Sequence, residues 1–90
     1  MNKKRSRFDI IGEILKTIRD KRGRIKQTHL MYKVNLSHKL MKSCLEELMS
    51  RDMIEENRKE NNIYIIIKDR GVDFLQKFEK MRQFQDAFGL

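Results

Sequence analysis

The stretch that decides the fold is LMYKVNLSHKLMKSCLEEL, Leu30–Leu48. Its apolar periodicity breaks at Val-Asn-Leu-Ser, residues 34–37, and then resumes. Asn35 is suited to the left-handed conformation of a tight turn, and Ser37 is a good N-cap for a following helix. Two helices joined by so short a turn are typical of a helix-turn-helix. The apolar face of the second helix, with spacing i, i+3, i+4, i+7, consists of Met41, Cys44, Leu45 and Leu48.

A longer helix is predicted ahead of this motif, over residues 7–21. Ser6 and Asp9 have the spacing of a capping box at its start. Gly23 is available for the left-handed position beyond its end. A helix of about two turns then leads into the turn at residues 34–37. The apolar stripe of the long helix, read as core, is Ile11, Ile14, Leu15 and Ile18.

A change of period after Asp52 predicts a β-hairpin. Met53–Asn57 and Ile63–Ile67 are expected strands, since the second is rich in β-branched residues. The polar cluster 58–62 between them is the expected tip. A hairpin directly behind a helix-turn-helix is a wing, and Arg58 and Lys59 at its tip suit phosphate contacts.

Helical periodicity returns near Arg70 and continues to the end of the sequence. A winged-helix core of this size is expected to close by about Leu75, so the later apolar residues need another role. Their partly heptad spacing predicts the seam of a short coiled coil that makes a homodimer. The alternative is that they fold back on the first helix as additional core. The residues predicted for the dimer interface are Phe74, Phe78, Met81, Phe84 and Phe88.

Positive charge is concentrated in the first part of the chain. Residues 1–51 carry 14 Lys and Arg against 5 Asp and Glu, a balance of +9. Residues 52–90 carry 7 against 8, a balance of −1, which gives the formal net charge of +8. A basic surface confined to part of a small domain is typical of a protein that binds a polyanion. Nucleic acid is the expected partner, with an acidic protein or an anionic membrane surface as alternatives.

Two groups of residues are predicted to contact DNA. A recognition helix presents its N-terminal residues to base edges, which favours side chains that open the helix at His38. The arm before the first helix and the tip of the wing are expected to contact phosphates. The alternative for the recognition helix is a solvated face with ordinary pairing between Lys42 and Glu46. The predicted helix contacts are Ser37, His38, Lys39, Lys42 and Ser43, and the predicted arm and wing contacts are Lys4, Arg5, Arg7, Arg58 and Lys59.

The sequence carries no catalytic or metal-binding pattern. His29, His38 and Cys44 lack the spacing of a metal site, so we expect no metal, no cofactor and no enzymatic activity. Cys44 lies on an apolar stripe and is expected to be a buried core residue rather than a redox sensor. No small-molecule ligand is indicated, and the longest apolar run, Ile63–Ile67, is far too short for a membrane span. A single cysteine favours a reducing, cytoplasmic compartment, where the nucleoid would be the place of action.

Several short segments also carry a resemblance to a known family. They are Lys4-Arg5-Ser6-Arg7, Ile10-Ile11-Gly12-Glu13-Ile14-Leu15, Met31-Tyr32, Asn35-Leu36-Ser37, Leu45-Glu46-Glu47-Leu48 and Arg70-Gly71-Val72-Asp73-Phe74-Leu75. Their order resembles the small archaeal winged-helix DNA-binding proteins of the 10a type, which are dimeric chromatin-associated or regulatory proteins. The resemblance implies that the final helix pairs with its symmetry mate in an antiparallel coiled coil. Two recognition helices would then face DNA as a pair.

The sequence therefore predicts a mainly α protein with a small β-hairpin, a winged helix-turn-helix followed by a C-terminal dimerisation helix. The expected parts are a basic arm over residues 1–6, a DNA-binding domain over 7–69 and the dimerisation helix over 70–90. The expected function is binding of double-stranded DNA by a homodimer, as a transcriptional regulator or a nucleoid-associated protein. The alternative is a winged helix that serves as a protein-interaction module in a larger assembly.

Overall fold

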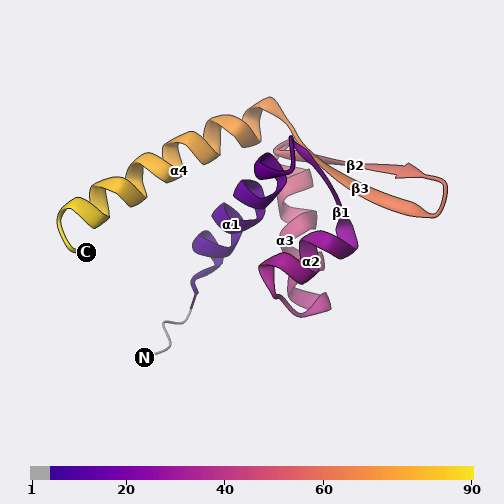
Figure 1. Ribbon diagram of the computed structural model, residues 1–90, viewed down its shortest axis with the longest axis horizontal. Helices are drawn as coiled ribbons and strands as arrows, with labels where there is room; N and C mark the ends of the chain where they lie inside the picture. The colour runs from indigo at the N-terminus through magenta and orange to yellow at the C-terminus, as the bar shows by residue number, and fades with distance from the viewer. Residues whose placement is uncertain (1–4) are drawn as a thin grey trace.

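The computed structural model describes residues 5–90 of the chain. Lys4, predicted to belong to the basic arm, lies outside the described residues. A three-helix body carries a hairpin that projects on one side and a long last helix that extends on the other (Figure 1). In chain order the elements are α1 (Arg7–Asp20), β1 (Arg24–Lys26), α2 (Gln27–Val34), α3 (His38–Ser50), β2 (Ile54–Lys59), β3 (Asn62–Ile67) and α4 (Asp69–Ala87).

A single apolar core lies between α1, α2, α3, α4 and one face of the sheet. Both predicted helical stripes contribute to it, with the exception of Ile11, which is only partly buried while Ile10 takes the buried place. In residues 5–90 no polar or charged side chain is buried. The core residues are Ile10, Ile14, Leu15, Ile18, Ile25, Leu30, Val34, Met41, Cys44, Leu45, Leu48, Ile54, Ile65, Leu75 and Phe78.

Local caps fix both ends of α1. At its start the predicted capping box is confirmed, because Asp9 N donates to Ser6 Oγ at 3.0 Å and Ser6 N donates to Asp9 Oδ2 at 3.3 Å. At its end the prediction for Gly23 is wrong by one position. Arg22 takes the first left-handed position with φ of +61°, and Gly23 follows with φ of +85°. The N–H of Gly23 donates to the carbonyl of Ile18 at 2.9 Å, which is the long bond of a Schellman turn.

The turn between α2 and α3 forms as the sequence predicts. Asn35 ends α2 in the left-handed conformation, with φ of +56°. Ser37 is the N-cap of α3 and its side chain accepts a hydrogen bond from the N–H of Leu40 at 3.2 Å. Only residues 35–37 separate the two helices, so α3 begins in a fixed orientation relative to α2.

The sheet has a strand that the sequence analysis does not predict. β1 pairs antiparallel with β3, which pairs antiparallel with β2, so the order is β1-β3-β2. Within β1 only Ile25 is buried, opposite Ile65 of β3. A strand of three residues with one inward side chain has no alternation to detect, and it forms because β3 supplies a partner.

The wing is longer and its turn is tighter than predicted. β2 continues through Arg58 to Lys59, which pairs with Asn62 of β3. The tip is therefore Glu60–Asn61 rather than residues 58–62, and Glu60 adopts a positive φ of +58°. Beyond Ile54 every residue of β2 is exposed. The outer part of β2 extends past the core, so its residues show no apolar alternation. The end of this strand therefore could not be predicted from the sequence.

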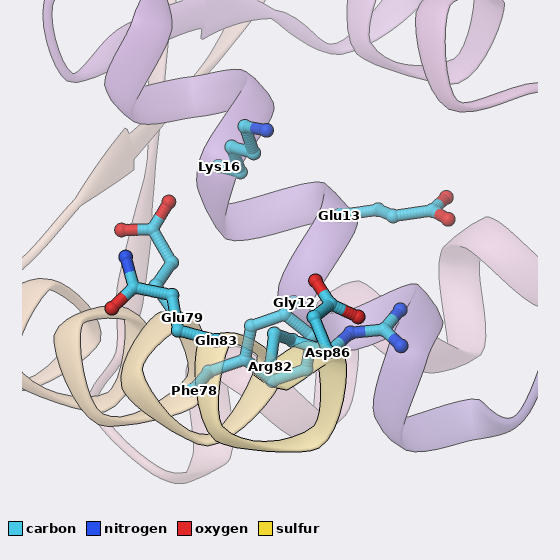
Figure 2. A pocket seen from close by; sticks show the side chains of 8 residues that line it. All are labelled: Gly12, Glu13, Lys16, Phe78, Glu79, Arg82, Gln83 and Asp86. Carbon is cyan, nitrogen blue, oxygen red and sulfur yellow. The ribbon is translucent and has the colours of Figure 1, made fainter. Parts of the chain in front are cut away.

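The position of α4 is fixed by two close contacts, one with the residue before β2 and one with α1. At its start, Lys68 N donates to the carbonyl of Met53 at 2.9 Å, and a Cβ on Gly71 would lie 2.3 Å from that same oxygen. Farther along, the ring of Phe78 lies on Gly12 of α1, where a Cβ would be 2.3 Å from Phe78 Cζ (Figure 2). The expectation that the core closes by about Leu75 is thus wrong, since it extends one turn further to Phe78, which is 9% exposed.

Ion pairs flank the contact between α1 and α4. Arg19 donates from its two terminal nitrogens to both carboxylate oxygens of Glu79, at 2.5 and 3.1 Å. Nearer the N-terminus of α1, Arg82 pairs with Asp9 at 3.2 Å. Residues of α4 up to Arg82 are thereby held along α1, and the last part of the helix continues beyond the body (Figure 1).

We expect Gly12→Ala to destabilise the protein by about 1 to 3 kcal/mol, the usual cost of overpacking a core. The added methyl group would overlap the ring of Phe78 and push α4 away from α1. Urea unfolding of the variant and the wild type measures the difference. In a Phe78→Leu background the same substitution should cost much less, because the shorter side chain leaves room. Equal costs in the two backgrounds would contradict this account of the contact.

Candidate nucleic-acid interface

The first two turns of α3 present a polar, basic surface. Ser37 caps the helix, and the side chains of His38, Lys39, Lys42 and Ser43 are all exposed. The opposite side of the helix is in the core, so the buried stripe determines which residues point outward. The five residues predicted on the recognition helix therefore lie together on one accessible face.

The two lysines of this face carry uncompensated charge. Within residues 5–90, neither Lys39 nor Lys42 forms an ion pair. The predicted alternative, a pairing of Lys42 with Glu46 one turn later, is not formed although the spacing allows it. The start of α3 thus offers two free ammonium groups to an anionic partner.

Glu47, near the far end of α3, is turned toward two arginines. Arg7 Nε donates to Glu47 Oε1 at 2.9 Å, and Arg51 lies 3.4 Å from the other oxygen. The hydrogen bond from Arg7 is the main cause that lowers the pKa of Glu47 below its ordinary value, and the same bond raises the pKa of Arg7. The acid is therefore neutralised beside α1 and does not add free negative charge to the polar face.

Arg7 also touches the polar face itself. Its guanidinium donates to Ser43 Oγ at 3.1 Å and to the Ser43 carbonyl at 3.4 Å. Both Arg7 and Ser43 were predicted to contact DNA, and the structure brings them into contact with each other. Arg7 holds α1 against α3, a role that sequence reasoning did not assign to it.

Arg5 holds the turn between α2 and α3. Its guanidinium donates to the carbonyls of Val34 and Asn35, at 2.8 and 3.0 Å, and pairs with Glu13 at 2.6 Å. The last carbonyls of a helix have no partner within the helix, and here an arginine from a distant part of the chain supplies one. This role was missed because nothing local in the sequence connects position 5 to the turn.

The wing carries the other predicted phosphate contacts. Arg58 is 75% exposed at its side chain and lies 3.8 Å from Glu56, at the outer limit of an ion pair. Lys59 is exposed beside the tip. Because the tip itself is Glu60–Asn61, these two cations project from the last positions of β2 and not from the turn.

The residues predicted for a dimer interface divide into two groups. Phe74 and Phe78 contact Phe8 of α1, with ring centroids 5.8 and 5.1 Å apart, so they pack within the chain. This matches the alternative of extra core for those two positions. The other three predicted residues are exposed at the end of α4, where Leu90, which was not among the predictions, joins them in a group that we call the α4 patch. It consists of Met81, Phe84, Phe88 and Leu90, which are 38%, 61%, 68% and 80% exposed.

The cysteine, the possible metal ligands and the length of the helices are the remaining candidate functional features. Cys44 is buried in the core as predicted, and burial raises the pKa of its thiol. Among residues 5–90 no three side chains of His, Cys, Asp or Glu are grouped as metal ligands would be. In the same part of the chain, no helix is both long and apolar enough to cross a bilayer.

Comparisons with known proteins agree with this architecture. A family model described as winged helix-turn-helix matches residues 4–86. No curated protein sequence matches the chain.

Several solved structures share the fold at low sequence identity. Sso10a-2, a DNA-binding protein from Sulfolobus solfataricus, superposes with a TM-score of 0.80 at 14% identity, over 93% of this chain and 85% of that one. F93 from STIV, a winged-helix DNA-binding protein, gives 0.77 at 14% identity over 91% and 92%. A mutant MarR from E. coli, complexed with operator DNA, gives 0.72 at 16% identity over 84% and 55%.

The pKa of Glu47 offers a direct test of the clamp between α1 and α3. A lowered carboxyl pKa stabilises the fold above the ordinary glutamate value, about 4.3, and that contribution is lost as the pH falls through the lowered value. We expect the Glu47 carboxyl, followed by NMR, to titrate below its ordinary range and to return toward it in Arg7→Gln.

Glu79 is the internal control for this titration. Its pKa is lowered mainly by the hydrogen bond from Arg19, so it should be unaffected by Arg7→Gln. A wild-type Glu47 that titrates at the ordinary glutamate pKa would show that the clamp is not formed in solution.

Proposed function

This chain belongs to the winged helix-turn-helix family, and from that premise we propose that it binds double-stranded DNA as a homodimer. One observation carries the proposal. Lys39 and Lys42 stand unpaired on the exposed start of α3, within the part of the chain that the structure describes, while Glu47 is held aside by Arg7. In helix-turn-helix proteins this part of the second helix enters the major groove.

The proposed contacts divide between base reading and phosphate binding. His38, Lys39, Lys42 and Ser43 would carry any sequence preference, because they project from the first turns of α3. Arg58 and Lys59 on the wing, together with Lys4, would bind phosphates without regard to sequence. Arg5 and Arg7 contribute indirectly in this proposal, since their guanidinium groups hold the turn and α3 in place.

We propose that the α4 patch makes the dimer. Its four side chains, Met81, Phe84, Phe88 and Leu90, are all exposed, and a group of exposed apolar side chains on a monomer is often a site of protein–protein contact. Complete burial of eight such side chains per dimer contributes at most about 12 to 24 kcal/mol. Association costs about 4 to 15 kcal/mol, so pairing is favourable over most of this range.

Within this proposal the chain has three parts: an arm over residues 1–6, a DNA-binding domain over 7–69 and a dimerisation helix over 70–90. The first half of that last helix also packs on α1 through Phe74 and Phe78. Pairing of α4 with its symmetry mate would set two recognition helices at a fixed spacing. The structural likeness to Sso10a-2 supports the 10a-type assignment, with a role as transcriptional regulator or nucleoid-associated protein.

We expect duplex DNA binding to weaken steeply with salt. If a dimer contacts about six to eight phosphates, the slope of log affinity against log salt is about −5 to −7. Lys42→Ala should cost about 1 to 3 kcal/mol on a preferred site if Lys42 pairs with guanine, whereas Lys59→Ala should weaken binding to all sequences alike. Fluorescence anisotropy with duplexes selected from a randomised pool measures both quantities.

The control for charge is Arg70→Gln with Lys80→Gln. Both residues are exposed on α4 and belong to neither α3 nor the wing, so this variant should bind nearly as the wild type. Lys39→Gln with Lys42→Gln removes the same charge and should bind far more weakly. No duplex binding by the wild type at low salt would overturn the proposed function and favour an acidic protein as the partner of the basic face. A strong preference among duplexes would favour a regulator over a general DNA-coating protein.

The proposed dimer predicts that Phe84→Glu with Phe88→Glu yields a folded monomer. The core should survive because Phe74 and Phe78, not these two residues, pack on α1. Sedimentation at tens of micromolar would give the mass, and DNA affinity should drop steeply as the paired contacts are lost. Gln76→Glu with Gln83→Glu adds the same charge at polar positions of α4 and should remain dimeric. A wild-type chain that sediments as a monomer would refute the dimer.

A further inference from the structure

A second concentration of positive charge lies at the end of α2 that is nearer the sheet. Here the turn that follows α1, the strands β1 and β3 and the first turn of α2 surround an open recess of about 500 Å³, which we call the β1 recess. β1 leads directly into α2 at this point (Figure 1). The residues that line the recess are Lys21, Arg22, Arg24, Ile25, Lys26, His29 and Tyr64.

The recess is lined by four cations and by no carboxylate. Within residues 5–90, none of Lys21, Arg22, Arg24 and Lys26 takes part in an ion pair. By contrast Arg19, one turn earlier, is bound to Glu79. Four like charges on one small surface repel each other, so an anion that enters the recess relieves that repulsion and is attracted by all four.

The backbone holds these cations in place. Arg24 and Lys26 of β1 lie opposite Ile66 and Tyr64 of β3, so both project from the face of the sheet that bears Tyr64. The guanidinium of Arg24 lies over the Tyr64 ring, 4.0 Å from its centroid. Arg22 is fixed by the Schellman turn that ends α1. The charges are thus presented by a strand and a structured turn and not by a loose loop.

The start of α2 adds to this field. Lys26 is its N-cap and makes no side-chain capping bond, and the first turn contains no acidic residue. The free N–H groups of that turn carry partial positive charge. A helix N-terminus alone does not indicate a binding site. This one lies beside four cations that have no ion-pair partner within the described part of the chain.

The length of α2 relates the recess to the proposed reading face. Its eight residues span about 12 Å at 1.5 Å per residue, which is close to the width of the major groove of B-DNA, about 12 Å. The first helix of a helix-turn-helix crosses the DNA backbone while the second occupies the groove. If α3 occupies the groove as proposed, the end of α2 at the β1 recess is the end farthest from the turn to α3, and it would lie toward the phosphates at the groove edge.

We propose that the β1 recess binds the phosphodiester backbone of the duplex that α3 reads. The inference rests on the proposed function and adds a second, sequence-independent anchor on each protomer. These phosphate contacts are separate from the base contacts proposed for His38 and the lysines of α3. Arg22, Arg24 and Lys26 supply the charge, and Tyr64 keeps Arg24 in position.

The test is the double variant Arg22→Asn with Lys26→Gln. Asparagine tolerates the left-handed conformation that Arg22 adopts, φ of +61°, so the turn should be retained. Loss of two phosphate contacts should make the slope of log affinity against log salt less negative by about 2 per protomer. Affinity should fall by the same factor on preferred and on random duplexes. The matched control is again Arg70→Gln with Lys80→Gln, which lowers the net charge equally.

A measurement on the wild type removes any dependence on the folding of the variant. On titration with duplex, the backbone amides of residues 22–26 and His29 should shift together with those at the start of α3. If the wild type binds duplex and the α3 variant Lys39→Gln with Lys42→Gln loses binding, the proposed function stands. Should the recess variant then match its control and the recess amides stay unshifted, this inference is overturned on its own. A wild type that binds no duplex overturns both.

Discussion

The geometry of the turn at residues 35–37 is the constraint on which the rest of the molecule depends. Asn35 accepts a left-handed backbone and Ser37 caps the next helix, so α2 and α3 meet at one angle. Arg5 then binds the two carbonyls that the end of α2 leaves open. The apolar stripe of α3 can reach the core only in this orientation, and the same rotation turns its lysines to solvent. Core packing and the basic surface are therefore two consequences of one turn.

The positive charges of the chain serve two purposes that composition alone cannot separate. Arg7 and Arg19 are bound to Glu47 and Glu79, and these pairs tie α1 to α3 and to α4. The cations at the start of α3 and in the β1 recess have no such partner within residues 5–90. The lysines and arginines behind the net charge of +8 thus include a paired group that stabilises the scaffold and a free group that makes the surface attractive to a polyanion.

The position of α4 depends on a glycine of α1. Without a Cβ on Gly12, the ring of Phe78 reaches the backbone of α1 and extends the core along α4. That contact commits Phe74 and Phe78 to the domain and leaves Phe84 and Phe88 outside it, 61% and 68% exposed. The division between core and exposed patch follows from where α1 begins beside α4, since Phe8 and Asp9 contact Phe78 and Arg82, and not from any change in the pattern of α4.

The sequence by itself determined the helices, the N-caps of α1 and α3, the turn at residues 35–37 and the face of α3 that points outward. These features depend on neighbours within about four positions, which periodicity and capping chemistry reveal. Only the tertiary structure decided the strand β1, the partners of Arg5 and Arg7, and the burial of Phe78 against Gly12. Each of these contacts joins residues far apart in the chain. β1 pairs with the edge of β3, Arg5 binds carbonyls at the end of α2, and Phe78 fits where Gly12 has no side chain. No local sequence pattern predicts such contacts, because they stabilise the protein only after folding has brought the distant residues together.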